Sequence, residues 1–223
     1  MFERYAFPDQ LAAEREFLPG AAWWKFATRF NVSAAQYVPA IRMHDGQTEG
    51  VMLRWGLIPS WVEEMPTGQP KASVSITRVE QSKIYRTPWL ESQRCILPVA
   101  GFYAWHLTSA GYRQPYFVRL TDRAVFGVAA LWDRWVSDDD DVIESCSVIR
   151  VPANELITEI SGSDGGMPAI LRRKDYRTWL QGTPVQAKAI LHPYKAKWMQ
   201  AYPVSPRINS SEVDDSTLIR AAG

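Results

Sequence analysis

Apolar and polar positions alternate over several stretches of the chain, and this pattern predicts β-strands. The stretches 50–61 and 94–105 are rich in β-branched and aromatic residues, and both end at turn-forming residues. The stretch 101–135 predicts a meander whose later strands cover 115–120 and 125–131. Strands that follow one another through short turns pair antiparallel, so we expect an antiparallel sheet.

Short helical patterns precede and follow these strands. Pro8 is expected in the first turn of one helix, and Thr183 with Pro184 supplies an N-cap and a first helical position for another. No repeat or low-complexity linker divides the sequence. We therefore expect an α+β fold in a single domain over 1–223, with helices around curved antiparallel sheets. The predicted helices cover 8–17, 152–160, 175–180 and 185–191.

Composition sets limits on the class of protein. A chain of 223 residues with 46% apolar and 12% aromatic residues can bury one well-packed core. The net charge is +1, from 25 basic and 24 acidic residues, so any contact with DNA must come from a local basic patch. The sequence shows no secretory signal and no apolar run of about eighteen residues, so we expect no membrane partner and a soluble protein of the cytoplasm.

Residues that often carry chemistry are sparse. Cys95 and Cys146 are the only cysteines, both lie in apolar stretches, and each is predicted to be a buried structural thiol. The three histidines are isolated, and 162–166 lacks the lysine of a phosphate-binding loop, so we expect no metal and no cofactor. The acidic run 138–141 predicts a solvated hairpin loop, because consecutive side chains diverge.

Four segments together resemble the SOS-response-associated peptidase (SRAP) family. Any one alone would be weak, but all four occur in family order, and the resemblance covers about 1–212. It implies a barrel-like SRAP-type arrangement of curved antiparallel sheets with short peripheral helices. The segments are 55–61 (WGLIPSW), 94–98 (RCILP) running into 101–103 (GFY), 167–171 (MPAIL) and 202–209 (YPVSPRIN).

The resemblance also implies a chemistry. Family members bind single-stranded DNA at abasic sites, and they belong to a peptidase class. Their second residue is a cysteine, made N-terminal by removal of methionine, and it closes a thiazolidine ring on the sugar aldehyde. Such chemistry needs a thiol and a free amine on one residue, together with an acid and a base to move protons.

Every position that the resemblance assigns to this chemistry holds a different side chain here. Phe2 stands at the cysteine, Ile76 at an asparagine, Ala104 at a glutamate and Asp164 at a histidine, while Gly166 replaces a nearby arginine. We therefore expect a divergent member of the family with no catalytic residues of the family type, whose thiazolidine-forming and autopeptidase activities are lost.

The resemblance also implies that this chain keeps some of the residues that lie near the family's DNA groove. The matching residues are Arg4, Arg78, Trp55, Trp61 and Trp105. Arginines beside aromatic rings hold single strands through phosphate contacts and base stacking, without any reaction. The competing interpretation is that these tryptophans are core residues and the arginines ordinary surface charges, and for the tryptophans the sequence leaves both open.

Three functions remain as hypotheses. The first is non-covalent binding of single-stranded or abasic-site DNA, or of a protein at such sites. The second is a partner-binding or regulatory module with a closed groove, favoured by Glu3 and the acidic loop 138–141. The third is a residual peptidase or lyase in which Asp164 and Glu80 act as acid and base. Residues after Asn209 give little signal and are expected to be loosely ordered.

Overall fold

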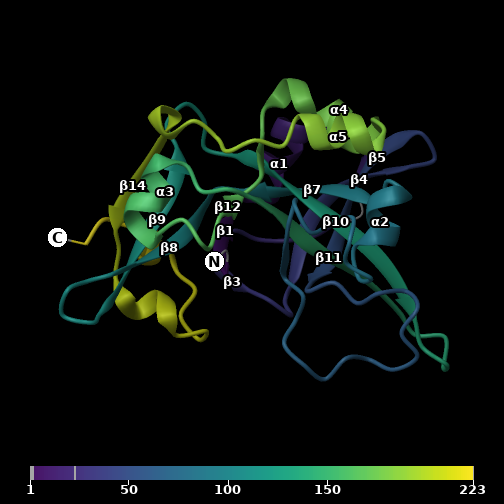
Figure 1. The fold of residues 1–223 in the computed structure, drawn as a ribbon, viewed down its shortest axis with the longest axis horizontal. Coiled ribbons are helices and arrows are strands. Elements are labelled where there is room, and N and C mark those ends of the chain that lie inside the picture. The colour runs from purple at the N-terminus through teal and green to yellow at the C-terminus, as the bar shows by residue number, and fades with distance from the viewer. Residues whose placement is uncertain (1–2, 23, 223) are drawn as a thin grey trace.

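Five strands of the larger sheet close on themselves into a barrel (Figure 1). They pair antiparallel in the order β11, β10, β7, β4, β5, and a parallel pairing of β5 with β11 closes the ring through Ser145 opposite Arg54 and Cys146 opposite Trp55. The computed structural model describes residues 3–22 and 24–222. The barrel strands are β4 (Tyr37–His44), β5 (Gln47–Trp55), β7 (Arg94–Val99), β10 (Phe126–Val136) and β11 (Val142–Val151).

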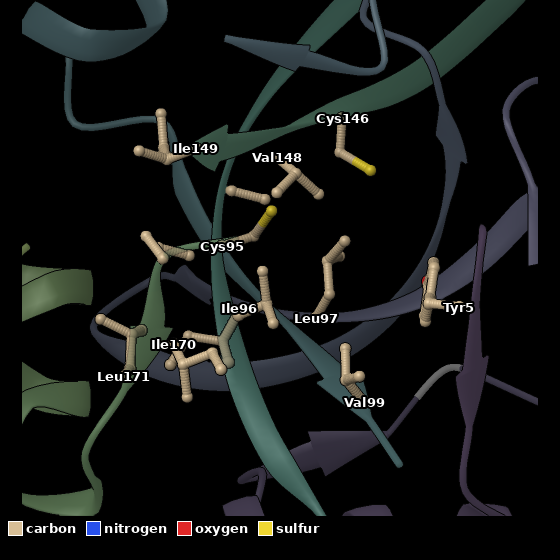
Figure 2. Close-up of a cluster of buried hydrophobic side chains, with 14 of the residues drawn as sticks. Tyr5, Cys95, Ile96, Leu97, Val99, Cys146, Val148, Ile149, Ile170 and Leu171 are labelled. Carbon is tan, nitrogen blue, oxygen red and sulfur yellow. The ribbon is translucent and has the colours of Figure 1, made fainter. Parts of the chain in front are cut away.

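The barrel interior is the main hydrophobic core. Cys95, Leu97, Cys146 and Val148 lie inside it, as Figure 2 shows. All six residues of β7 are buried, because the helix α4 (Tyr176–Gln181) packs on its outer side. Burial on both faces explains why this strand reads as a nearly continuous apolar run rather than an alternating one.

A second, antiparallel sheet has the strand order β14, β9, β8, β1, β3. Ala100 alone separates β7 from β8, so the chain passes there from the barrel into this sheet. The first strand links the two cores: Tyr5 packs in the barrel core with its ring 5.2 Å from that of Trp55, while Ala6 belongs to the second core. The strands are β1 (Arg4–Phe7), β3 (Arg29–Ser33), β8 (Gly101–Leu107), β9 (Arg113–Leu120) and β14 (Met199–Pro203).

The helices are short and peripheral, as the sequence predicts. Thr183 and Pro184 form the expected start of α5, with a complete capping box. Pro8 precedes the N-cap Asp9 of α1 and does not lie in its first turn. Among the described residues no helix is long and apolar enough to cross a bilayer. The remaining helices and short strands are α1 (Gln10–Phe17), α2 (Arg86–Leu90), α3 (Glu155–Ser161), α5 (Pro184–Ala189), β2 (Ala21–Ala22), β6 (Ser73–Ser75), β12 (Met167–Pro168) and β13 (Ile170–Leu171).

The predicted strands are confirmed with shifted boundaries. The strand expected over 50–61 ends at Trp55, because Gly56 turns the chain with φ +127°. The stretch 94–105 is two strands, one in each sheet. The acidic run 138–141 forms the exposed tip of the β10–β11 hairpin, as predicted.

The expectation that residues after Asn209 are loosely ordered is wrong. Asp214 accepts hydrogen bonds from the backbone N–H of Phe30 (2.6 Å) and of Asn31 (2.9 Å), and it also pairs with Arg29. The Asn31 side chain donates to the carbonyl oxygens of Ser210 and Val213, each at 2.7 Å. The C-terminal segment thus covers the edge strand β3 through polar contacts that hydrophobic patterning cannot reveal.

Replacing Asp214 by alanine should destabilise the protein by about 1.5–3 kcal/mol, because three donors around β3 lose a charged acceptor. Urea denaturation followed by tryptophan fluorescence measures the change. Asp138→Ala, in the exposed hairpin tip, is the matched control and should change the free energy of unfolding by less than about 0.5 kcal/mol. Equal effects of the two substitutions would contradict the assigned role of Asp214.

Candidate functional site

Two adjoining cavities open beside the parallel seam of the barrel. The larger, of about 680 Å³, is called the basic cavity here, and the smaller, of about 280 Å³, the tryptophan cavity. Lys71 and Ile84 line both, so the two cavities are neighbours. The walls come from the loop 56–72, from β6, from the turns 76–85, and from the loop 163–166 that precedes β12.

The basic cavity carries a surplus of positive charge. Lys71, Arg78 and Arg150 line it, and Asp164 is the one carboxylate that the described residues contribute to its walls. None of the three cations forms an ion pair with a described residue, whereas Arg42, on the barrel, pairs with two glutamates. An open cavity with unpaired cations attracts anions, since the one carboxylate, that of Asp164, offsets only part of their positive charge.

Burial and neighbouring charge shift the titration of the groups in this cavity. Burial lowers the pKa of Arg150, and the nearby Arg78 charge lowers it further, while Tyr85 acts in the opposite direction. Burial raises the pKa of Tyr85, against the opposing effects of a Ser147 hydrogen bond and the Arg150 charge. Tyr85 is therefore a neutral hydrogen-bonding group at pH 7 near the Arg150 charge, and Arg150 in turn lies near the Arg78 charge.

Trp61 is presented to solvent by an anchored loop. Its side chain is 57% exposed and lines the tryptophan cavity together with Pro59 and Pro70. The backbone N–H of Ile58 donates to Ser145 Oγ at 2.8 Å, and that of Ser60 donates to Asp133 Oδ2 at 2.9 Å. These bonds anchor the loop to the barrel, so the position of the exposed Trp61 ring is fixed by hydrogen bonds to the barrel strands.

Trp55, only six residues earlier, is fully buried. Its Nε1 donates to the carbonyl oxygen of Ala72 at 2.8 Å, and its ring packs edge-on against Tyr5. The core interpretation therefore applies to Trp55, which offers no free ring face for a base. Its contribution to the site is indirect, because the bond to Ala72 holds the end of the cavity loop.

Arg4 and Trp105 lie together but outside both cavities. Arg4 donates to Asn31 Oδ1 at 2.7 Å and to the backbone carbonyl of Asn209 at 3.3 Å. Trp105, partly buried on β8, donates from Nε1 to Asn209 Oδ1 at 3.0 Å. The five residues proposed for DNA binding thus occupy three places, and the cavities contain two of them, Arg78 and Trp61.

The proposed acid and base pair is not assembled. Asp164 is exposed in the basic cavity, where its Oδ1 accepts from Ser163 Oγ at 3.3 Å. Glu80 pairs instead with Lys188 on α5 at 2.8 Å and is not among the residues lining the cavity. The residual peptidase or lyase hypothesis therefore gains no geometric support.

Comparison with known proteins now identifies the family. The family model described as SOS response associated peptidase (SRAP) matches residues 2–211. The chain belongs to the SRAP family. It is 29% identical to the abasic site processing protein YoaM of Bacillus subtilis (strain 168), over 96% of this chain and 92% of that protein. It is 24% identical to the abasic site processing protein HMCES of Mus musculus, over 72% of this chain and 53% of that protein.

Solved structures agree with this assignment of the fold. A crystal structure of a protein from Bacteroides thetaiotaomicron superposes with a TM-score of 0.77 at 26% identity, covering 86% of this chain and 85% of that one. A protein from Bordetella bronchiseptica gives a TM-score of 0.78 at 22% identity, over 92% of this chain and 100% of that one, and this shows shared fold alone. The expected SRAP-type architecture is confirmed.

Of the positions that the sequence resemblance assigns to the family's reactive residues, two are apolar and enclosed. Ile76 is 9% exposed and Ala104 is 6% exposed. Asp164 alone among them carries an ionisable group, and Phe2 lies outside the described residues. Within the described part of the chain, no three histidine, cysteine or carboxylate side chains gather to hold a metal ion.

Sequence analysis missed Lys71 and Arg150. Lys71 follows a loop rich in proline and glycine and belongs to no motif. Arg150 does leave a trace, since it is a lone cation in the apolar run 148–151 of a barrel strand. A lone cation in an apolar strand indicates a polar environment at the end of β11. The elements that form this environment, β6 and β12, are identified only by the three-dimensional structure.

Both cysteines should resist thiol reagents in the folded protein. Cys95 and Cys146 are fully buried in the barrel, and burial raises the pKa of each thiol, with the other thiol adding to the shift at Cys146. A chromogenic disulfide reagent at pH 8 should titrate almost no thiol in native protein and two thiols per chain in guanidinium chloride. Rapid labelling of native protein would contradict this assignment and would reopen the search for a nucleophile.

Proposed function

We propose that this SRAP-family protein binds single-stranded DNA, including strands with an abasic site, reversibly and without covalent bond formation. The observation that carries the proposal is the open basic cavity, in which Lys71, Arg78 and Arg150 form no ion pair with any described carboxylate, beside the exposed Trp61. Relatives named abasic site processing proteins support DNA as the partner. The two free cysteines suit a reducing compartment, and we propose the cytoplasm as the place where the protein works.

The two cavities match the two chemical parts of a single strand. Phosphates are bound by cations, and an unstacked base gains about 1–3 kcal/mol by stacking on an aromatic ring. Trp61 lies in the wall of the tryptophan cavity with prolines, and the basic cavity adjoins this cavity at Lys71. One strand crossing both would place a base against Trp61 while neighbouring phosphates contact the cations.

The side chains that are present support the proposed loss of covalent chemistry. Thiazolidine formation requires a thiol beside a free amine, and the position that the resemblance assigns to the cysteine holds Phe2. Cys95 and Cys146 are enclosed in the barrel and line neither cavity. An open cavity with excess positive charge also gives no support to a closed groove reserved for a protein partner.

Binding of a fluorescent 15-nucleotide strand should weaken steeply with salt. Three phosphate contacts release counterions with a slope of about −2 in log K against log salt, so affinity should fall roughly twentyfold between 50 and 200 mM NaCl. Arg78→Gln should weaken binding and reduce the slope by about 0.7. Fluorescence anisotropy measures both quantities.

The control for that experiment is Arg113→Gln, an exposed arginine at the start of β9 with no part in either cavity. It should leave the affinity and the slope unchanged apart from a small effect of net charge. Absent binding, or binding that does not respond to salt, would overturn the proposed function.

No denaturant-stable adduct should form with a strand that contains one abasic site. Denaturing gel electrophoresis after long incubation, without reductant, should show free DNA only. The same mixture should show retarded DNA on a native gel at low salt. Treatment with borohydride provides the stricter test: a trapped product that disappears in Lys71→Arg would show that an amine in the cavity reacts with the sugar aldehyde, against the proposal.

A further inference from the structure

The SRAP resemblance places an arginine at position 166, where this chain has glycine. A different arginine, Arg150, reaches the same loop from strand β11. Gly166 has φ +62°, and a Cβ built there would lie 2.5 Å from the backbone oxygen of Val151. No ordinary side chain fits that backbone. Arg150, on β11, instead donates from Nη1 to the carbonyl oxygen of Gly165 in this loop.

The register of β11 explains how Arg150 enters the cavity. Cys146 and Val148 face the barrel core, and side chains alternate along a strand, so Arg150 continues on their side. Pairing with β10 stops at Val148, however, and Arg150 pairs with Ser75 of β6 and Pro168 of β12. This end of β11 therefore extends beyond the barrel, and the side chain of Arg150 lines the basic cavity instead of the barrel core.

Arg150 is left with donors that the protein does not use. Its Nε is buried and has no hydrogen-bond partner among the described residues, and no described carboxylate pairs with the group. Arg78 lies close enough for its charge to be felt. Buried donors without acceptors are costly, and two like charges side by side add to that cost. A bound anion would relieve both.

We propose that the basic cavity is a binding site for a phosphate monoester, with Arg150 as its principal contact. This inference rests on the proposed function, because it names the chemical group that the same cavity binds. Three cations against the single carboxylate of Asp164 leave two positive charges. A monoester carries close to two negative charges at neutral pH, whereas a phosphodiester inside a strand carries one.

The remaining features of the cavity fit the same ligand. Arginine binds phosphate oxygens through the N–H donors of its guanidinium, and Nη2 of Arg150 is neither buried nor hydrogen-bonded to a described residue, whereas Nη1 bonds to Gly165. Hydroxyl groups supply further donors from several sides of the cavity. A volume of about 680 Å³ matches sites for small organic ligands rather than bare ions, so the sugar has room as well. The hydroxyls belong to Ser73, Ser75, Thr77, Ser82 and Ser163.

Two sources of a monoester are possible, a DNA strand end and a free nucleotide, and the test separates them. Three 12-nucleotide strands with one internal fluorescent label carry a 5′-phosphate, a 3′-phosphate, or hydroxyls at both ends. We expect one phosphorylated strand to bind at least about tenfold more tightly than the hydroxyl strand, as charged hydrogen bonds imply. Calorimetry with deoxyadenosine 5′-monophosphate and with inorganic phosphate tests the free ligands.

Arg150→Gln should remove the preference for the phosphorylated end, and Arg113→Gln should retain it. Thermal unfolding of each variant checks that the fold persists. If Arg150→Gln fails to fold, Arg150→Lys keeps the charge but loses the paired donors, and its preference should fall by several-fold. A preference that is unchanged in a folded Arg150 variant would overturn the assignment.

The outcomes for the wild-type protein separate this inference from the proposed function. Equal affinity for all three strands, with no binding of nucleotide or phosphate, overturns the monoester site, although salt-dependent binding of the hydroxyl strand would still support the proposed function. Nucleotide binding that depends on Arg150, without binding of any strand, would support the site and overturn DNA binding. Tighter binding of a phosphorylated strand than of the free nucleotide assigns the site to a strand end.

Discussion

The parallel pairing between β5 and β11 is the constraint on which the site depends. It closes the barrel through Arg54 and Trp55 opposite Ser145 and Cys146. The chain leaving β5 continues this contact, since Gly56 N–H donates to the Cys146 carbonyl at 2.8 Å. Further along the same edge of β11, residues 148–150 pair with β6, the strand that follows the loop 56–72. One strand therefore holds both ends of the loop that carries Trp61 and Lys71.

A closed barrel also explains why these cavities lie at its edge. Inside, side chains fill the space, and the interior residues of small barrels are packed rather than open. Strand β11 is longer than its pairing with β10, so its last residues emerge from the ring and meet β6 and β12. Polar side chains are tolerated there because solvent reaches them, as the partial exposure of Arg150 illustrates.

Local sequence patterns predict the helices and strands but do not predict which strands pair with one another. The capping box at Thr183, the hairpin at 138–141 and most strands follow from residue types within a few positions. Pairing between β5 and β11 joins residues about ninety positions apart, and no local pattern specifies it. Trp55 and Trp61 have the same side chain, yet one is core and the other exposed, because Gly56 ends the strand between them. Asp214 likewise looks ordinary until its partners on β3 are known.

The side chains at the positions that the sequence resemblance assigns to the family's reactive groups suit the proposed binding without reaction. Ile76 and Ala104 stand in enclosed positions, where a carboxylate or amide would need compensating hydrogen bonds to offset the cost of burial. Replacing such groups by apolar side chains removes that requirement and stabilises the surroundings. The cations of the basic cavity are different, because Lys71 and Arg78 are exposed and cost little to keep. Under the proposed function, a site with apolar side chains at these enclosed positions and solvated cations beside them holds a ligand without transforming it.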